Sequence, residues 1–246
     1  MKLSLKQTID YYRDIRPHNL TSDKYKHLFL LIYWPIYGLV FLTLEQFWPH
    51  IWEAITGNEL VYHEVSCWID AYIPLCELFV IPYYYWFVSL VGMVIYGLLF
   101  DIRAFRHFMW FIILSYSITA IIYVIWPNMQ MLRPDMTDFP RDNWMTDIIK
   151  GLYGYDTNTN VCPSIHVLGA VAVGCAGWHS EHFRGWGWKL FFVISTILVS
   201  ISTVFLRQHS IIDVIAAVVL CIVCYILVFF VICRPKKKGI DSPAAS

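Results

Sequence analysis

Long uninterrupted apolar runs constrain this chain more than any other feature of its sequence. Several stretches of roughly 20 residues carry few charges, and roughly 20 apolar residues in a helix cross a hydrocarbon core of about 30 Å. Charged residues make up only 15% of the chain, which is less than a soluble domain of this size carries. The sequence therefore predicts a polytopic membrane protein.

We predict an all-α fold, because the hydrocarbon core of a bilayer offers the backbone no hydrogen-bond partners. Backbone N–H and C=O groups find no partner in hydrocarbon, so each spanning segment must satisfy them internally as a helix. We predict a six-transmembrane-helix bundle. Its spans cover residues 28–47, 78–100, 107–126, 164–180, 188–206 and 210–233.

The whole chain, residues 1–246, is predicted to form a single membrane domain. The segment 1–27 is polar and lacks the apolar core of a cleaved signal peptide. The six-helix bundle then covers residues 28–233, and 234–246 is a polar tail. The stretch 48–77 contains no span, and its tryptophans and tyrosines suggest anchoring at the membrane interface.

Lys and Arg are distributed unequally between the two sides of the predicted bundle. Fourteen of the 18 lie on the side of the two termini, and the remaining four are Arg133, Arg141, Lys150 and Arg207. The positive-inside rule therefore places both termini in the cytoplasm, in a plasma or cytoplasmic membrane. The loops after the first, third and fifth spans then face outward.

A histidine and an aspartate stand four residues apart where the fifth predicted span turns into the sixth. At the start of a helix, His209 and Asp213 would share one face. The carboxylate can accept the proton of one ring nitrogen and leave the other nitrogen free to attack an electrophile. An isolated pair of this spacing is also compatible with a structural histidine, although an ionisable residue inside a span is a functional candidate.

Two further outward segments contain groups that handle anions. Pro163 and Ser164 precede an apolar helix and make a plausible N-terminal cap, whose free amides and positive dipole end suit a phosphate. His166, in the first turn, can protonate a leaving oxygen. Arg133 can bind phosphate oxygens through its planar fork. Taken singly, the Pro163–His166 segment is also compatible with an ordinary capped helix, and Arg133 with a contact to lipid headgroups. Together with His209, the two segments supply a nucleophile, an acid and an anion-binding group.

The ordered set Arg133-Pro134, Pro163-Ser164-Ile165-His166 and Ser202…His209…Asp213 resembles the type-2 phosphatidic acid phosphatase superfamily. That superfamily includes lipid phosphate phosphatases, undecaprenyl pyrophosphate phosphatases and sphingolipid headgroup transferases. The resemblance covers about residues 80–230. It implies a mechanism without metal or cofactor in which His209 attacks phosphorus, Asp213 orients it and His166 protonates the departing alcohol. Arg133, Ser202 and the amides around Ser164 would hold the phosphate oxygens.

Two cations of the family pattern are missing here. Trp126 occupies the position of a lysine, and Ser202-Thr203 replaces a Ser-Arg pair. Headgroup transferases of the family often lack the same arginine. On a continuous helix Arg207 would point from the face of Thr203, one turn nearer the surface, so we expect it to bind phosphate instead. The lysine has no equally clear substitute; Arg141 and Lys150 are candidates only because they lie on the outward side.

Neither the acidic residues nor the cysteines have the spacing of a metal site. The seven cysteines indicate no disulfide framework, and Cys221 and Cys224 lie within an apolar run. A formal net charge of zero gives no support to nucleic-acid binding.

Small residues recur along the fourth predicted span, where they would allow close helix packing. They are Gly169, Ala170, Ala172, Gly174, Ala176 and Gly177.

Three functions are compatible with these residues. The leading one is a membrane phosphatase that hydrolyses a lipid phosphate or pyrophosphate at the outer leaflet through a phosphohistidine intermediate. A phosphotransferase would instead move a phosphorylated headgroup, of the phosphoinositol or phosphocholine type, between lipids. The third is a non-catalytic lipid-binding or transport protein with the same fold. The predicted partners are a phosphorylated lipid and the bilayer, and the sequence indicates no oligomeric state.

The cation distribution predicts an outward position for the loop 135–150. Single cysteines placed there, in a background without the native cysteines, should react with an impermeant thiol reagent added to intact cells. A cysteine at Arg184, in a predicted inward loop, serves as the control and should react only after the membrane is opened. The reverse labelling pattern would overturn the orientation.

Overall fold

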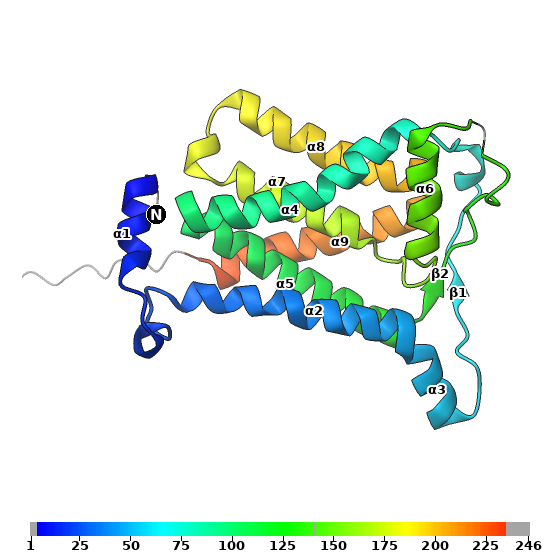
Figure 1. Ribbon diagram of the computed structural model, residues 1–246, viewed down its shortest axis with the longest axis horizontal. Helices are drawn as coiled ribbons and strands as arrows, with labels where there is room; N and C mark the ends of the chain where they lie inside the picture. Colours follow the sequence, from blue (N-terminus) through cyan, green and yellow to red (C-terminus); the bar gives the residue numbers. More distant parts are fainter. Residues whose placement is uncertain (1–3, 140, 235–246) are drawn as a thin grey trace, which may run out of the picture.

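Long helices running along one axis make up most of the structure, a computed structural model that describes residues 4–139 and 141–234 (Figure 1). The predicted tail lies outside these residues except for Arg234. The α-helices are α1 Leu5–Arg13, α2 Tyr33–Leu42, α3 Trp48–Thr56, α4 Val80–Phe100, α5 Ile102–Ile125, α6 Trp144–Tyr155, α7 Ile165–Trp178, α8 Trp186–Phe205 and α9 Ile211–Ile226. Short 3-10 and π-helical segments extend several of them.

Five helical segments of the described residues are long and apolar enough to cross a membrane. The chain is thus an integral membrane protein. The segments are Lys26–Thr56, Glu77–Phe100, Ile102–Ile125, Trp186–Phe205 and Ile211–Ile232. The six-span count is not confirmed, because the predicted span 164–180 corresponds to α7, which has 14 residues. At 1.5 Å per residue such a helix is about 21 Å long, shorter than a hydrocarbon core of about 30 Å.

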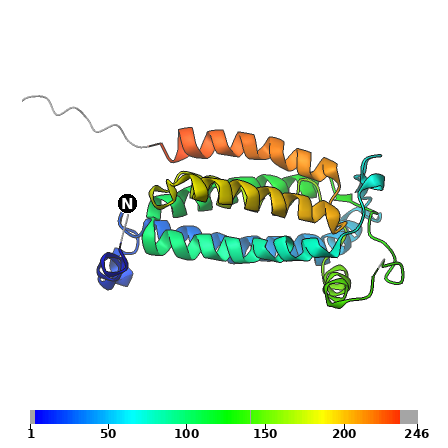
Figure 2. The same cartoon turned by 90° about the horizontal axis from the view of Figure 1, so that it is seen from above.

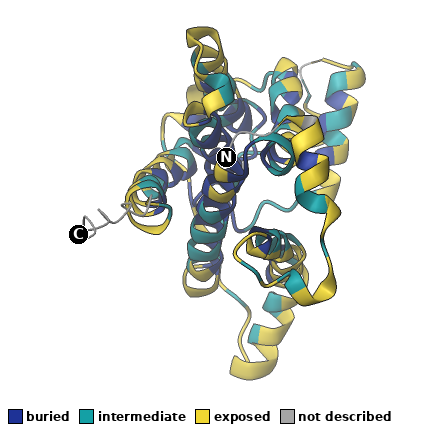
Figure 3. Cartoon of the chain, turned by 90° about the vertical axis from the view of Figure 1, so that its left-hand side faces the viewer, coloured by how far each residue is buried: buried dark blue, intermediate teal, exposed yellow. Residues whose placement is uncertain are grey.

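Helix α7 forms the centre of the bundle and packs against α4, α5, α8 and α9. Buried residues gather between the helices, and exposed residues lie on the outer faces (Figure 3). Many of the outer side chains are apolar, such as Val88 of α4 and Val219 of α9. An apolar exterior is what lipid tails require.

The small residues of α7 allow its neighbours to approach closely, as predicted. A Cβ added at Gly169 would lie 2.6 Å from the indole nitrogen of Trp86, and one added at Gly174 would lie 2.6 Å from the hydroxyl of Thr196. Gly177 faces the ring of Phe192 in the same way. The helices therefore lie side by side along the long axis, as the view from above also shows (Figure 2).

One end of the bundle carries α6 and a small sheet, whereas α1 lies at the other end (Figure 1). The strand β1, His63–Glu64, pairs in parallel with β2, Asn128–Met129, so that His63 lies opposite Asn128. Met129 forms a further bridge with Thr159. Three segments far apart in the sequence are thus held together at this end.

The contact between α4 and α5 predicts a matched pair of substitutions. A Cβ at Gly97 would lie 2.6 Å from the Cβ of Phe105 and 2.8 Å from its Cα, whereas one at Gly92 would meet nothing within 4 Å. Gly97→Ala should lower the free energy of unfolding by about 1–3 kcal/mol through overpacking. Gly92→Ala should be neutral or stabilise by up to about 1 kcal/mol, because Ala favours helix. Thermal unfolding in detergent measures both, and equal melting temperatures would contradict this packing.

Candidate active site

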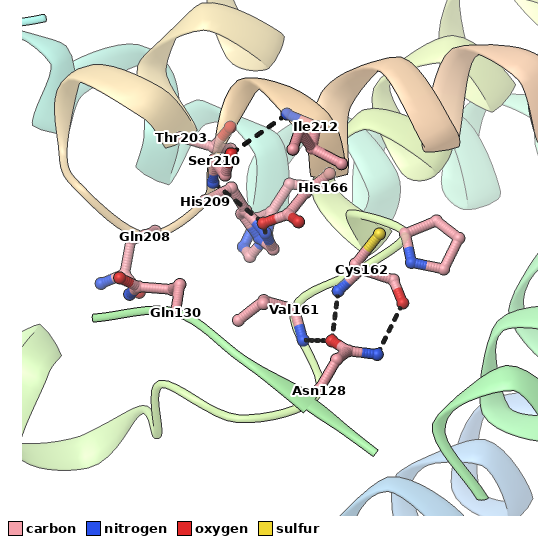
Figure 4. Close-up of polar contacts among 12 residues, drawn as sticks. Asn128, Gln130, Val161, Cys162, His166, Thr203, Gln208, His209, Ser210 and Ile212 are labelled. Carbon is pink, nitrogen blue, oxygen red and sulfur yellow. Dashed lines mark hydrogen bonds and ion pairs between the residues drawn. The ribbon is translucent and has the colours of Figure 1, made fainter. Parts of the chain in front are cut away.

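The three segments that the sequence singled out meet at the end of the bundle that carries α6 and the sheet. Figure 4 shows two of them, through His166 and His209. His166 lies in the first turn of α7, His209 lies between α8 and α9, and Arg133 follows β2. His166, His209 and Asp213 are all buried, with exposed fractions of 6%, 5% and 0%. Their charged and polar atoms therefore interact at reduced dielectric.

Asp213, His209 and His166 form a row of hydrogen-bonded side chains. Nδ1 of His209 lies 3.2 Å from Oδ2 of Asp213, and Nε2 of His209 lies 3.3 Å from Nδ1 of His166. A carboxylate only accepts hydrogen bonds, so we assign the ring proton of His209 to Nδ1. Its Nε2 then carries the free lone pair and faces His166.

A capping box, not a shared helical face, brings His209 and Asp213 together. Helix α9 begins at Ile211, so His209 precedes the helix and the predicted geometry was wrong. The amide of Ser210 donates to Oδ2 of Asp213 over 2.9 Å, and the hydroxyl of Ser210 accepts from the amide of Ile212 over 3.1 Å. The same carboxylate oxygen thus caps the N-terminus of α9 and forms a hydrogen bond with His209.

The turn between α8 and α9 is a Schellman motif. The amide of Gln208 donates to the carbonyl of Thr203 and that of Arg207 to the carbonyl of Val204, each over 2.9 Å. Arg207 has φ +52°, the left-handed conformation that this motif requires. The amide of His209 also donates to Thr203, over 3.1 Å. These bonds fix the direction in which His209 leaves the turn.

Arg207 lies beyond the end of α8, so it does not share a helical face with Thr203. The geometric reason for its prediction was therefore wrong: the left-handed residue redirects the chain. Its guanidinium donates to the carbonyl of Ile73, in the loop before α4. Its role as a phosphate ligand stays a prediction.

Arg133 is held by acceptors at the end of α6. Its terminal nitrogens donate to the carbonyls of Asp156, over 2.7 Å, and Thr157, over 2.6 Å, and to Oε1 of Gln208, over 2.5 Å. The guanidinium also lies 4.8 Å from the ring centre of Tyr153. Burial lowers the pKa of Arg133, and the charge of Asp156 opposes this effect. Its Nε is buried without a partner, which leaves one donor for a ligand.

Ser164 occupies the N-cap position of α7, as predicted, but its side chain forms no capping hydrogen bond. Its Oγ is buried without a partner, and its amide donates to the carbonyl of Asp213 over 3.3 Å. The positive end of α7 is therefore left uncapped by this side chain. Ser202 is also fully buried, but its hydroxyl donates to the carbonyl of Val199 in its own helix.

A family model for the PAP2 superfamily matches residues 104–236, more than half of the chain and all three segments. The chain belongs to the PAP2 superfamily. The resemblance drawn from the motifs is thereby confirmed. Members of this superfamily are generally phosphatases, which indicates phosphatase-type activity on a phosphorylated substrate. No curated protein and no solved structure matches the chain.

Two polar residues of this PAP2 chain that sequence reasoning missed hold the site loops. Oδ1 of Asn128 accepts from the amides of Val161, over 2.9 Å, and Cys162, over 2.8 Å (Figure 4). Nε2 of Gln130 donates to the carbonyl of Arg207 over 3.0 Å. The segment 128–133 thus contacts both histidine-bearing segments. A single amide side chain in a loop gives no periodic signal in the sequence, so these contacts of Asn128 and Gln130 could not be inferred from it.

Asp70 is a third missed residue, and it caps α9 from outside the matched PAP2 region. Its carboxylate accepts from Oγ of Ser210, over 2.6 Å, and from the amides of Ile211, over 2.9 Å, and Cys67, over 2.8 Å. Burial raises the pKa of Asp70, but these hydrogen bonds outweigh it and hold the pKa below its ordinary value. The ionised carboxylate therefore stabilises the turn that presents His209.

Glu45 fixes the loop that leads into α7. Its carboxylate accepts from the hydroxyls of Thr157 and Thr159 and from the side-chain amide of Asn160, the last over 2.7 Å. This contact joins the first predicted span to the site.

The cations considered as substitutes for the missing lysine are engaged elsewhere. Arg141 lies 3.1 Å from Glu77, and Lys150 lies 3.6 Å from Asp142. Trp126 stacks on His63 with ring centres 5.7 Å apart. Within residues 4–139 and 141–234, no three His, Cys, Asp or Glu side chains form a group that could hold a metal. Metal independence stays a prediction.

Replacing Asp70 tests its support of the site. Asp70→Asn should lower the free energy of unfolding by about 1–3 kcal/mol, because it weakens three buried hydrogen bonds to a charged acceptor. The folded pKa lies below the ordinary value of 3.8, so the stabilisation is present above that pH and is lost as pH falls through the folded pKa. Denaturation at pH 7 and at lower pH measures it, with the exposed Asp135→Asn as control. A variant as stable as the control would contradict the assignment.

Proposed function

We propose that this PAP2 protein hydrolyses a lipid phosphate or pyrophosphate at the outer leaflet through a phosphohistidine on His209. One observation carries the proposal: Asp213, His209 and His166 stand in a buried row, with 3.2 Å and 3.3 Å between successive polar atoms. The row orients a histidine whose free nitrogen faces a second histidine. This arrangement suits a nucleophile paired with a proton donor.

In the first step Nε2 of His209 attacks phosphorus, with His166 in its protonated, imidazolium form. The new P–N bond forms as the P–O bond to the lipid alcohol or phosphate breaks, and His166 gives a proton to the departing oxygen and becomes neutral. The carboxylate of Asp213 stabilises the positive charge that develops on the ring of His209. In the second step His166 takes a proton from water, the water oxygen attacks phosphorus, and the P–N bond breaks. Inorganic phosphate leaves and both histidines return to their starting states.

The two histidine rings must separate when substrate binds. A nucleophile attacks from about 3–3.5 Å, and an acid lies about 2.6–3.2 Å from the oxygen it protonates on the opposite side of phosphorus. The present distance of 3.3 Å between Nε2 of His209 and Nδ1 of His166 leaves no room for that group. The ring of His166 packs against Tyr83 and Trp86, with centres 4.7 Å and 4.4 Å away. To admit the phosphoryl group, the ring of His166 must therefore move away from His209 against this packing.

Buried donors near the row support binding of an anion. Nε of Arg133, Oγ of Ser164 and Nε2 of Gln208 are all buried without a partner. An unpaired buried donor is costly, so a ligand that accepts from it gains free energy. The uncapped N-terminus of α7 adds a positive dipole end. We propose that these groups hold the phosphate oxygens and stabilise the charge of the transition state.

The position of the row supports a lipid substrate. The chain is an integral membrane protein, and His166 and His209 lie at one end of its apolar helices. The adjacent loop exposes Trp68 and Tyr72, with exposed fractions of 76% and 79%, which is typical of interfacial anchoring. A phosphorylated headgroup at the interface would reach the row while its chains stay in the bilayer.

Headgroup transfer is the second candidate, and Thr203 favours it. This residue replaces the arginine that headgroup transferases of the family also often lack. A lipid hydroxyl would then take the place of water in the second step. Purified protein assayed with a panel of lipid phosphates, with and without an alcohol acceptor and with EDTA, separates the alternatives. Phosphate release supports hydrolysis, a new phospholipid supports transfer, and neither product would indicate a binding or transport protein.

The proposed roles predict graded losses of activity. His209→Ala should abolish hydrolysis and transfer, because the attacking nitrogen is removed. His166→Ala should slow the phosphorylation of His209 about 10²–10⁴-fold with a lipid alcohol as leaving group but much less with p-nitrophenol, which needs no proton. Hydrolysis of the phosphohistidine should be slow in this variant with either donor, because the base of the second step is also removed. Asp213→Asn should have an activity between those of these two variants, since it disturbs the orientation and charge of His209 and the cap of α9 but leaves the attacking nitrogen in place. The exposed His50→Ala is the control, and turnover that survives His209→Ala would refute the mechanism.

The turn geometry separates two roles of Arg207. Arg207→Gly removes the guanidinium and relieves the cost of about 1–2 kcal/mol that a Cβ carries at φ +52°, whereas Arg207→Ala removes the guanidinium and keeps the Cβ of the wild type and its cost. If the charge assists phosphate binding, both variants should lose about tenfold or more in kcat/KM. Wild-type kcat/KM in Arg207→Gly would show that only the turn matters.

A further inference from the structure

Two adjoining cavities lie at the end of the bundle opposite to His209. The first is an apolar groove of about 350 Å³ between α7, α8 and α9, lined by side chains such as Val171, Val193 and Ile197. The second is a polar cavity of about 500 Å³ lined by Arg103, Arg184 and Lys189 among others. Trp178 and His179, at the end of α7, line both cavities. The two form one amphipathic recess.

Cations outnumber carboxylates in the polar cavity. Arg184 lies 3.5 Å from Glu181, the carboxylate that also lines it. The buried Asp101 nearby accepts from the hydroxyl of Ser180 over 2.8 Å and from two amides of α5. Within the part of the chain that the structure describes, no ion pair joins a carboxylate to Arg103 or Lys189. These two charges are available to an external anion.

The floor of the recess positions one of these two cations, Lys189. The ammonium of Lys189 lies 4.8 Å from the ring centre of Trp178, a cation–π contact that holds it over the mouth of the groove. Nε2 of His179 lies 2.9 Å from the hydroxyl of Tyr225, which joins α7 to α9 at the same place. A phosphate beside Lys189 would therefore have an apolar groove directly beneath it.

We propose that this recess binds one anionic phospholipid, with its phosphodiester on Arg103 and Lys189 and an acyl chain in the groove. Charge complementarity selects an anionic headgroup, and the apolar groove selects a lipid over a free phosphate. The site is separate from the catalytic row, because the 12 residues from His166 to Trp178 span about 18 Å of helix. The predicted orientation assigns the recess to the cytoplasmic leaflet, where anionic lipids are enriched.

Lipid titration of the full-length protein in detergent tests the proposal. Dioleoylphosphatidylglycerol is a phosphodiester, so a phosphomonoesterase site does not consume it. It should raise the melting temperature and bind about tenfold more tightly than dioleoylphosphatidylcholine, as two headgroup cations are engaged. Inorganic phosphate also fits the catalytic row, so any shift that it gives should be the same when Arg103 and Lys189 are both replaced by Gln. Equal binding of the two lipids, or a phosphate shift that is lost in that double variant, would overturn the lipid site.

Three variants locate the site within the recess. The double variant with Arg103→Gln and Lys189→Gln should bind phosphatidylglycerol no more tightly than phosphatidylcholine. Arg106→Gln is the matched control: it is exposed on the same helix, does not line the cavity, and should keep the preference. Ile197→Trp, at a position 53% exposed on α8, should fill the groove and weaken phosphatidylglycerol binding. A preference that survives both recess changes, or that is lost equally in Arg106→Gln, would refute the assignment. Activity on a soluble phosphate reports folding in each case.

Discussion

The carboxylate of Asp213 makes the interaction on which the rest of the site depends. Its Oδ2 accepts from the amide of Ser210 over 2.9 Å and lies 3.2 Å from Nδ1 of His209. The contact with Ser210 caps the N-terminus of α9. The contact with His209 orients its ring so that Nε2 faces His166. One buried oxygen therefore couples the beginning of a membrane helix to the tautomer of the proposed nucleophile. Loss of that charge would loosen the helix start and the histidine together.

The remaining architecture keeps three chain segments around that oxygen. The small residues of α7 bring it close to α4 and α8, which places His166 opposite His209. Asn128 and Gln130 then hold the backbone of the segments that precede α7 and α9, and Asp70 adds a second cap to α9. A rigid frame of this kind allows a short helix of 14 residues to contribute to a membrane site.

The sequence predicted the helical membrane class, the family and the segments that meet at the site, because hydropathy and residue order record these directly. Its geometric arguments failed at helix ends. The capping box at Ser210 and the left-handed Arg207 determine where the helices stop, and apolar periodicity does not report either. Asp70 and Asn128 could not be predicted either, since each bonds to residues more than 30 positions away.

The central claim is that His209 carries the phosphoryl group during turnover. The most direct measurement incubates the purified protein with a lipid phosphate labelled on its phosphorus and then stops the reaction without acid. Digestion and mass spectrometry under alkaline conditions, which preserve phosphohistidine, then locate the label. The account predicts label on the peptide that contains His209, accumulation of that label in His166→Ala when p-nitrophenyl phosphate is the donor, and no label in His209→Ala. Label on another residue, or full turnover with no phosphorylated peptide at any time, would contradict it.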